Sequence, residues 1–417
     1  MRAALTPGPS LGTVATTAQK TLRTAVRETG RHPVAVGAAL TLIALNLRFA
    51  IAAVSPVLDD LRADVRLSSV GAGLLTTAPV LCFAAAAPLA SVLARRVGQE
   101  VLLLACMLAV ALGVAVRAVP AVGTVFAGTL VFGIAIAVAN VLMPSVIKRR
   151  FPDPGPIMAL YTTSLSVSAA IAAAASVPLE HAAGSWSWAL AFWAIPALLA
   201  AAAWLPASHV AGSTATPGSE HRVSLWRDRV AWLVTIAFGV QSLLFYALLS
   251  WLPDILRAEG MSSGRAGAML SIAMICGLPA SLLVPVIAGR VRDQRPLALV
   301  APAFWAAGLL GVLLAPHSLT VVWMVLLGLG QGAGIALALT LVVLRAPDAA
   351  HAASLSGMAQ GAGYALAAIG PVALGAAHQL TGSWHVPLAL MLAATLVLLV
   401  SGLGAAAPRF AGARAHR

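Results

Sequence analysis

Charged residues are scarce in this chain of 417 residues: Asp, Glu, Lys and Arg together make up 9% of it, whereas 60% of the residues are hydrophobic. A soluble domain carries roughly a quarter charged residues, so this composition excludes a soluble enzyme or binding domain. The formal net charge is +13. Because the basic residues lie in short segments between apolar runs, they are typical of cytoplasmic loops, and we expect no nucleic-acid partner.

Cysteine is also scarce. Cys82, Cys106 and Cys276 all fall inside apolar runs and show no paired spacing, which excludes a disulfide framework and a metal site of the usual kind. No cluster of His, Cys, Asp or Glu lies deep in an apolar run, and no G-x-x-x-x-G-K-[ST] loop occurs. The sequence therefore disfavours an embedded enzyme, a membrane receptor with a large soluble domain and an ATP-driven pump, and we expect no cofactor.

Long apolar runs are abundant, and they predict an all-α polytopic membrane protein with twelve transmembrane helices. The predicted spans are 33–58, 70–93, 101–119, 122–147, 157–179, 188–205, 230–252, 266–289, 297–315, 319–344, 353–377 and 386–407. A polar gap after the sixth span divides the chain into two six-helix bundles. The predicted parts are a tail (1–32), a first bundle (33–206), a central loop (207–229), a second bundle (230–407) and a final tail (408–417).

Basic residues indicate the orientation of these spans. If the N-terminus is cytoplasmic, 20 of the 26 Lys and Arg residues fall on the cytoplasmic side. We therefore expect a multi-pass protein of the inner (plasma) membrane with both termini and the central loop in the cytoplasm. An organellar transit peptide is an alternative interpretation of the Arg-rich and Thr-rich residues 1–32.

The two halves repeat one another. "LRADVRLSSVGAG" at Leu61 is followed by "LRAEGMSSGRAG" at Leu256, "RFPD" at Arg150 by "RAPD" at Arg345, and "GSW" at Gly184 by "GSW" at Gly382. The first two matches are offset by 195 residues. A parallel repeat of six-helix halves is typical of rocking transporters with a binding site near the bilayer midplane.

Several longer segments resemble a known family. They are "LNLRFAIAAVSPVLDDLR" (45–62), "AGLLTTAPVLCFAAAAPLA" (72–90), "NVLMPSVIKRRFP" (140–152), "LYTTSLS" (160–166) and "GMAQGAGYALAAIGPVALGAAHQLTGSW" (357–384). Together they resemble the major facilitator superfamily and, within it, the cyanate and 2-nitroimidazole transporter (CynX/NimT) family. The resemblance implies a secondary transporter that moves a small solute by alternating access. The superfamily loop after the second span is incomplete here, because its aspartate is replaced.

Arg48 is the charged residue that lies deep in a span. A charge at the bilayer centre costs at least about 2.5 kcal/mol, so embedded charges usually face a cavity and serve function. Because no other span carries a deep carboxylate, the planar guanidinium favours an anionic or polar planar solute such as cyanate, a small carboxylate or a nitro compound. The alternative is a structural role in which Arg48 binds backbone carbonyls at a helix break or neutral polar side chains.

Other polar residues in the spans are candidates to complete the site. In resembling proteins helices one, four, five, seven and eleven line the pathway, which favours Asn140, Tyr161, Gln241, Gln360 and Tyr364. The remaining candidates are Thr76, Thr77, Thr162, Tyr246 and Gln331. Asn46 lies two residues from Arg48, about 200° around a helix, and is expected to point away from the cavity.

Coupling and gating residues are predicted at the two ends of the pathway. Asp59, Glu180 and Asp254 are candidates at the outer mouth, and protons or a counter-ion are candidate co-substrates. Arg95, Arg96, Gly98 and Arg290 are the candidate cytoplasmic gate. Import and export both remain open, including efflux of polar antimicrobial compounds, and we expect a monomer in the lipid bilayer that binds a small-molecule solute.

Overall fold

The computed structural model describes residues 32–212 and 224–412, and the regular elements within these ranges are all helical. Most of the predicted N-terminal tail and parts of the central loop and of the C-terminal tail lie outside the described residues. The first half contains α2 (Pro33–Ala52), η1 (Ser55–Val57), α3 (Leu58–Asp64), α4 (Ser69–Val97), α5 (Gln99–Arg117), α6 (Val122–Arg150), α7 (Gly155–Ala183), α8 (Trp186–Ala191) and α9 (Ala194–Gly212). The second half contains α10 (Arg229–Ala258), α11 (Ser263–Arg290), α12 (Arg295–Leu314), α13 (Thr320–Leu344), α14 (Ala349–Thr381) and α15 (His385–Ala405).

Each of the twelve predicted spans coincides with one helix or with a short run of helices. In the described part of the chain, ten of these segments are long and apolar enough to cross a membrane. The two predicted spans outside that group are α4 and α14, which both pack against the opposite half of the molecule. The polytopic helical fold is therefore confirmed.

Two of the predicted spans are interrupted. The first helix stops at Ala52, only four residues after Arg48, and the chain continues through η1 into α3. The sixth span begins with the six-residue helix α8 and resumes as α9 at Ala194. These breaks were not predicted, because both segments have the hydropathy of a continuous span and hydropathy carries no information on where a helix changes direction.

The repeated sequence segments fold into equivalent helix ends. Gly184 and Gly382 end α7 and α14 with φ values of +69° and +66°, a left-handed conformation that glycine adopts without a steric penalty. Asp348 caps α14 by accepting the N–H of His351 at 2.9 Å. Gly98, with φ +84°, forms the one-residue connection between α4 and α5.

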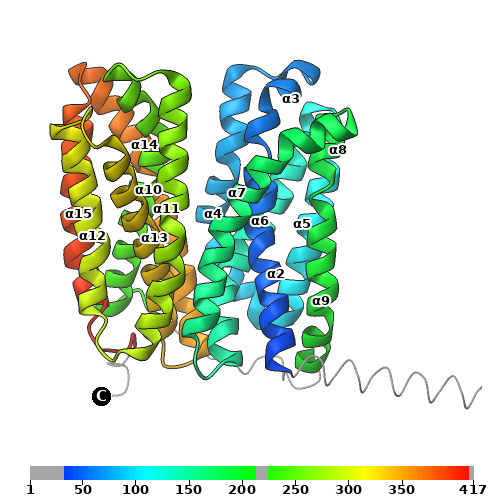
Figure 1. Cartoon of the computed structure of the whole chain (residues 1–417). Coiled ribbons are helices and arrows are strands. Elements are labelled where there is room, and N and C mark those ends of the chain that lie inside the picture. Colours follow the sequence, from blue (N-terminus) through cyan, green and yellow to red (C-terminus); the bar gives the residue numbers. More distant parts are fainter. Residues whose placement is uncertain (1–31, 213–223, 413–417) are drawn as a thin grey trace, which may run out of the picture.

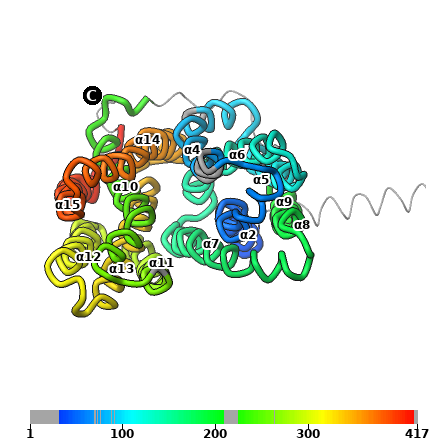
Figure 2. Tube along the Cα trace, turned by 90° about the horizontal axis from the view of Figure 1, so that it is seen from above, coloured from blue at the N-terminus to red at the C-terminus, as the bar shows by residue number. Residues whose placement is uncertain are grey.

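The helices form two bundles that stand side by side, α2–α9 in one and α10–α15 in the other (Figures 1 and 2). We call the end where α2 begins and α15 ends the basal end, and the opposite end the distal end. Between the bundles, α7 packs against α11, and α14 packs against α4 and α6. The bundle arrangement thus brings helices from both halves to a shared central surface.

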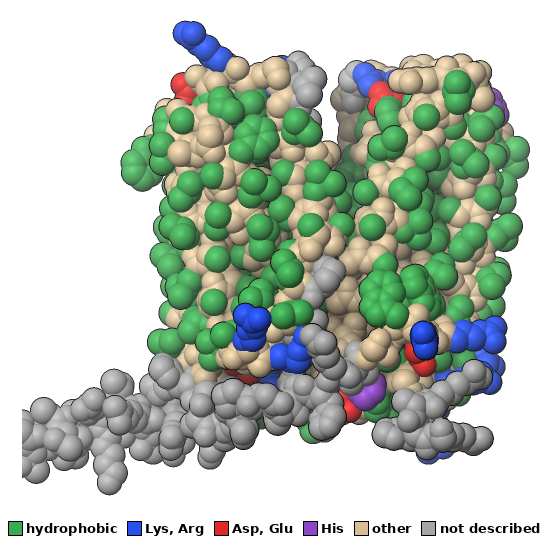
Figure 3. Space-filling model, turned by 180° about the vertical axis from the view of Figure 1, so that it is seen from behind, with side chains coloured by type: hydrophobic (Ala, Val, Ile, Leu, Met, Phe, Trp, Pro, Cys, Tyr) green, Lys and Arg blue, Asp and Glu red, His purple; other side chains and the backbone are tan. Residues whose placement is uncertain are grey.

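The two halves touch at the basal end and separate at the distal end. At Gly155, the first residue of α7, an added Cβ would lie 2.9 Å from the carbonyl oxygen of Pro285 in α11, so only glycine allows this approach. Thr162 Oγ1 donates to the carbonyl of Ser281 at 2.8 Å, again between α7 and α11. The space-filling view shows the molecule hollowed between the halves at the distal end (Figure 3). This structure is therefore closed at the basal end and open at the distal end.

Candidate functional site

Arg48 lies one helical turn before the end of α2, about 22 Å along the helix axis from Pro33 at 1.5 Å per residue. Its side chain is partly exposed. The guanidinium carbon is 5.7 Å from the centroid of the Phe83 ring in α4, within the range of a cation–π interaction. Across residues 32–212 and 224–412, the ion pairs that the structure contains do not include Arg48.

Three tyrosines surround this guanidinium, and the chain contains only three. Tyr161 in α7, Tyr246 in α10 and Tyr364 in α14 are all close enough to interact electrostatically with Arg48. The Tyr246 and Tyr364 rings are 6.5 Å apart. The site therefore combines one cation from the first half with phenol groups from both halves.

Phenylalanines complete the wall around Tyr364. Its ring lies 5.2 Å from the ring of Phe83 and 5.2 Å from that of Phe238, the second in an edge-to-face arrangement. Such pairs fix ring orientation more strongly than area burial alone. Phe83 and Phe238 therefore fix the orientation of the Tyr364 ring beside Arg48.

Asn140 and Gln360 join the two halves just below Arg48. Gln360 Nε2 donates to the backbone carbonyl of Asn140 and to Ser356 Oγ, both at 2.9 Å, and Tyr161 donates its hydroxyl proton to Asn140 Oδ1 at 3.2 Å. Gln360 lies one helical turn closer to the basal end than Tyr364. Asn140 Nδ2 is buried and has no hydrogen-bond partner in the described part of the protein. These contacts connect α6, α7 and α14, and they leave one buried amide donor without a partner among the described residues.

The structure thus brings together Arg48, Asn140, Tyr161, Gln360 and Tyr364, five of the six predicted binding residues. Gln241 is placed elsewhere: its Nε2 donates to Gln331 Oε1 at 2.7 Å, and its Oε1 accepts from Trp305 Nε1 at 3.2 Å. Its side chain is completely buried between α10, α12 and α13. Tyr246, which sequence reasoning considered but did not favour, takes the place of Gln241 beside Arg48.

The predicted mouth residues lie at the distal end. Asp59 is almost fully exposed and pairs with Arg62 at 3.6 Å, and Asp254 pairs with Arg257. Glu180, near the end of α7, interacts electrostatically with Asp60. These carboxylates therefore stand at the open side of the cleft.

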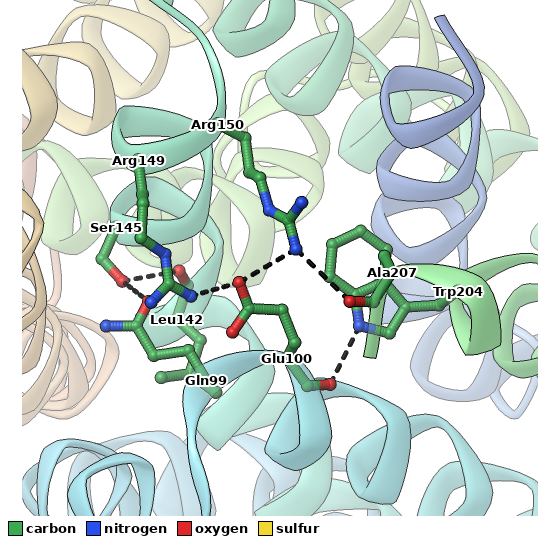
Figure 4. Close-up of polar contacts among 8 residues, drawn as sticks. All are labelled: Gln99, Glu100, Leu142, Ser145, Arg149, Arg150, Trp204 and Ala207. Carbon is green, nitrogen blue, oxygen red and sulfur yellow. Dashed lines mark hydrogen bonds and ion pairs between the residues drawn. The ribbon is translucent and has the colours of Figure 1, made fainter. Parts of the chain in front are cut away.

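At the basal end, the predicted gate arginines take part in fewer ion pairs than the neighbouring residues do. Arg96 and Arg290 are exposed, and Arg95 is partly buried. The neighbouring Glu100 instead pairs with Arg149 and with Arg150, the latter at 3.2 Å, as Figure 4 shows.

Further hydrogen bonds extend this network within the first bundle. Arg150 also donates to the carbonyl of Ala207 at 3.4 Å, and Trp204 Nε1 donates to the carbonyl of Glu100 at 2.9 Å. The Glu100 network therefore fastens α5, α6 and α9 to each other.

With this geometry established, comparison with known proteins identifies the family. The model of the Major Facilitator Superfamily matches residues 40–368. The chain belongs to the major facilitator superfamily. It is 40% identical over 374 residues to the uncharacterized transporter YycB of Bacillus subtilis (strain 168), covering 89% of this chain and 93% of that protein.

Two relatives from Escherichia coli (strain K12) place the chain in the cyanate and 2-nitroimidazole transporter family. The 2-nitroimidazole transporter is 37% identical over 378 residues, and the cyanate transport protein CynX is 31% identical over 382 residues. Each alignment covers 90% of this chain, with 96% and 97% of the respective relatives. The resemblance proposed from sequence is confirmed.

A solved structure shows the same fold. The proton:xylose symporter XylE, bound to 6-bromo-6-deoxy-D-glucose, superimposes with a TM-score of 0.71 at 14% identity, covering 89% of this chain and 94% of that one. The chain is therefore a multi-span membrane transporter of a superfamily that moves small solutes, and its relatives are transporters rather than enzymes.

Proposed function

We propose that this transporter carries a small anionic or polar planar solute and binds it at Arg48 in the cleft between the bundles. The observation that supports the proposal most directly is the position of Arg48. It is partly exposed, it contacts aromatic side chains, and no carboxylate pairs with it among the described residues. An arginine fork presents parallel N–H donors that match carboxylate, nitro and similar planar groups.

The surroundings of Arg48 support a flat solute. Tyr246, Tyr364 and Phe83 offer aromatic faces, and the free Asn140 Nδ2 offers a second donor. Two relatives are named for cyanate, a small linear anion, and for 2-nitroimidazole, a small planar ring with a nitro group. The proposed solute is therefore of that chemical class, bound through donors on one side and aromatic rings on the others.

Uptake into proteoliposomes tests this function. The panel is cyanate, 2-nitroimidazole, small carboxylates and amino-acid analogues, each with and without a pH gradient. We expect at least one planar anion or nitro compound to be transported, and Arg48→Gln to reduce its uptake about 100-fold, the size expected for a lost charge-assisted bidentate contact. Export of lipophilic cations alone, or an unchanged KM in Arg48→Gln, would overturn the proposal.

We also propose that the basal end faces the cytoplasm of a bacterial inner membrane. Basic side chains gather at this end of the molecule (Figure 3), in agreement with the positive-inside rule. The structure would then be outward-facing. A fluorescent protein fused after Arg417 should fluoresce in cells, because it folds in the cytoplasm; an alkaline phosphatase fusion at the same site that is active in the periplasm would reverse the orientation.

Coupling is part of the same proposal. An anion entering a negative-inside cell works against about 2.3 kcal/mol per 100 mV, so import requires a co-ion, an exchange partner or consumption of the solute. Asp59, Glu180 and Asp254 are the candidate proton carriers at the distal mouth. A pH gradient should accelerate uptake in the native protein and have less effect in Glu180→Gln if Glu180 carries the proton.

A further inference from the structure

A second arginine, Arg117, lies close to the end of the helix that carries Arg48. Arg117 is the last residue of α5, and its side chain is completely buried. Its Nη1 donates to the backbone carbonyl of Ala50 in α2 at 2.7 Å, and its guanidinium carbon lies 4.7 Å from the Phe132 ring.

The position of this hydrogen bond gives it significance. The last carbonyls of a helix have no partner within the helix, and they carry its negative dipole end. The helix α2 stops at Ala52, and the Ala50 carbonyl, two residues beyond Arg48, belongs to this unpaired group. A buried cation is a favourable partner for such a carbonyl. Arg117 therefore occupies the role at a helix break that was the alternative explanation for Arg48.

Two other contacts hold the same turn of α2. Asn46 Nδ2 donates to the carbonyl of Pro196 in α9 at 3.1 Å. Its side chain therefore points into the first bundle, in agreement with the expectation that it faces away from Arg48. Phe49 stacks on Trp193 with ring centroids 4.7 Å apart. The residues on either side of Arg48 are thus fixed to the first bundle, which leaves Arg48 directed at the cleft.

We propose that Arg117 is a positioning residue that holds the end of α2 and thereby keeps Arg48 directed into the binding site. This inference rests on the proposed function of Arg48. It assigns the two arginines different tasks: Arg117 satisfies the backbone of the helix end, and Arg48 remains available for the solute.

Hydrogen exchange on the purified full chain tests the contact without any ligand. Arg117→Met should increase exchange in peptides covering residues 48–58, and Arg117→Lys, which keeps a cation, should restore most of the protection. Arg66→Met is the matched control, because it removes an exposed arginine near the same end of the bundle. Equal protection of residues 48–58 in Arg117→Met and the native protein would overturn the inference.

Equilibrium binding of radiolabelled 2-nitroimidazole and cyanate tests the link to Arg48. Arg117→Met should raise Kd about 10-fold in the native background and leave it nearly unchanged in Arg48→Gln, because coupled residues give non-additive effects. A rise of equal size in both backgrounds would show that Arg117 acts independently of Arg48 and would overturn the inference. The proposed function fails by a different result: the single variant Arg48→Gln binds with the same Kd as the native protein. The failure of the inference and the failure of the proposed function are therefore distinguishable.

Discussion

Gln99 and Arg150 in the first half have counterparts 195 residues later, Gln294 and Arg345 in the second half. Arg150 donates to the carbonyl of Ala207 near the end of α9, and Arg345 donates to the carbonyl of Ala405 at 2.9 Å at the end of α15. In each half, an arginine at the basal end of the fourth span thus binds a backbone carbonyl of the last helix of its bundle. Arg150 is the last residue of α6, and Arg345 follows α13 directly. The repeat therefore preserves the way each bundle is held together at the basal end.

The cavity shows the opposite pattern. The position equivalent to Arg48 is Leu243, and the position 195 residues after Arg117 is Val312. Even at the basal end, Glu100, which pairs with Arg149 and Arg150, corresponds to Arg295 in the second half. The repeated arginines, Arg150 and Arg345, hold each bundle together at the basal end. Arg48, in contrast, has no charged counterpart, because Leu243 occupies the equivalent position in the second half. This difference makes the first half the better target for changes in solute binding.

Exchanging Arg48 and Leu243, the equivalent positions that differ in charge, should have the largest effect on solute uptake. In Arg48→Leu/Leu243→Arg, we expect uptake to fall more than about 100-fold, because a lost charged contact costs several kcal/mol and the new arginine cannot replace it. Leu243 packs on Gly370 of α14, where an arginine has no cavity to enter. Proteoliposome uptake measures the loss, and Arg48→Leu alone is the control. Recovery of uptake in the double variant would contradict the inequality of the halves.

Removal of the Glu100 carboxylate should have the next largest effect. Glu100→Gln leaves Arg149 and Arg150 without their carboxylate, and because both arginines are partly exposed we expect a loss of about 2 kcal/mol rather than the full cost of a broken buried pair. In the second half, Gln294 accepts a hydrogen bond from Arg345, the counterpart of Arg150, and Gln294→Ala should cost about 1 kcal/mol. Thermal unfolding in detergent measures both. A larger loss in Gln294→Ala would reverse the comparison.

The contact between the halves can be weakened at Gly155. In Gly155→Val the new side chain would press on Pro285, and overpacking of this kind costs about 1–3 kcal/mol. We expect the basal contact to open, which spin labels on α7 and α11 would report as a longer distance. Gly123→Val is a matched control, because a Cβ there meets nothing within 4 Å. Equal distances in both variants would show that Gly155 does not set the closure.

The smallest effect concerns two aspartates that accept backbone N–H groups at the starts of helices, again 195 residues apart: Asp348 at α14, and Asp153, which accepts the N–H of Gly155 at 3.2 Å, at α7. Burial acts to raise the pKa of Asp348, but hydrogen bonds from the His351 N–H and ring lower it on balance from its ordinary value of 3.8. Because the pKa of Asp348 is lower in the folded chain than its ordinary value of 3.8, its hydrogen bonds contribute their full stabilisation to the fold above pH 3.8. This stabilisation is lost as the pH falls through the folded pKa.

Asp348→Ala should therefore cost about 1 kcal/mol at pH 7 and less at a pH well below 3.8, where the carboxyl group is protonated in the folded chain as well. Thermal unfolding at the two pH values measures it, with Asp153→Ala as the counterpart in the first half. A cost that grows on acidification would contradict the assigned hydrogen bonds.

Much of the fold was predictable from sequence, because a membrane span depends mainly on its own residues. A long apolar run in a bilayer must form a helix, since only a helix pairs all its backbone N–H and C=O groups within the run. The isolation of Arg48 in such a run also marked it as the first candidate for a binding residue, which stays a prediction. The breaks at Ala52 and before Ala194 were not predictable, since they depend on contacts such as that between Arg117 and Ala50.

The choice between Gln241 and Tyr246 shows a different limit. The two lie five residues apart in α10, so they point about 140° apart around the helix and cannot both face the cleft. Hydropathy does not say which one does, because both are polar interruptions in an apolar run. The decision follows from Gln331 and Trp305, which bind the Gln241 amide in the interior of the second bundle.

The confinement of all three tyrosines to the cleft has a practical consequence. Any label introduced through tyrosine enters this protein only beside Arg48. Fluorine-labelled tyrosine would give three resonances, one each from α7, α10 and α14, with no background from the rest of the chain. Solute entry and the movement of one bundle against the other could then be followed in the native sequence, without an engineered reporter.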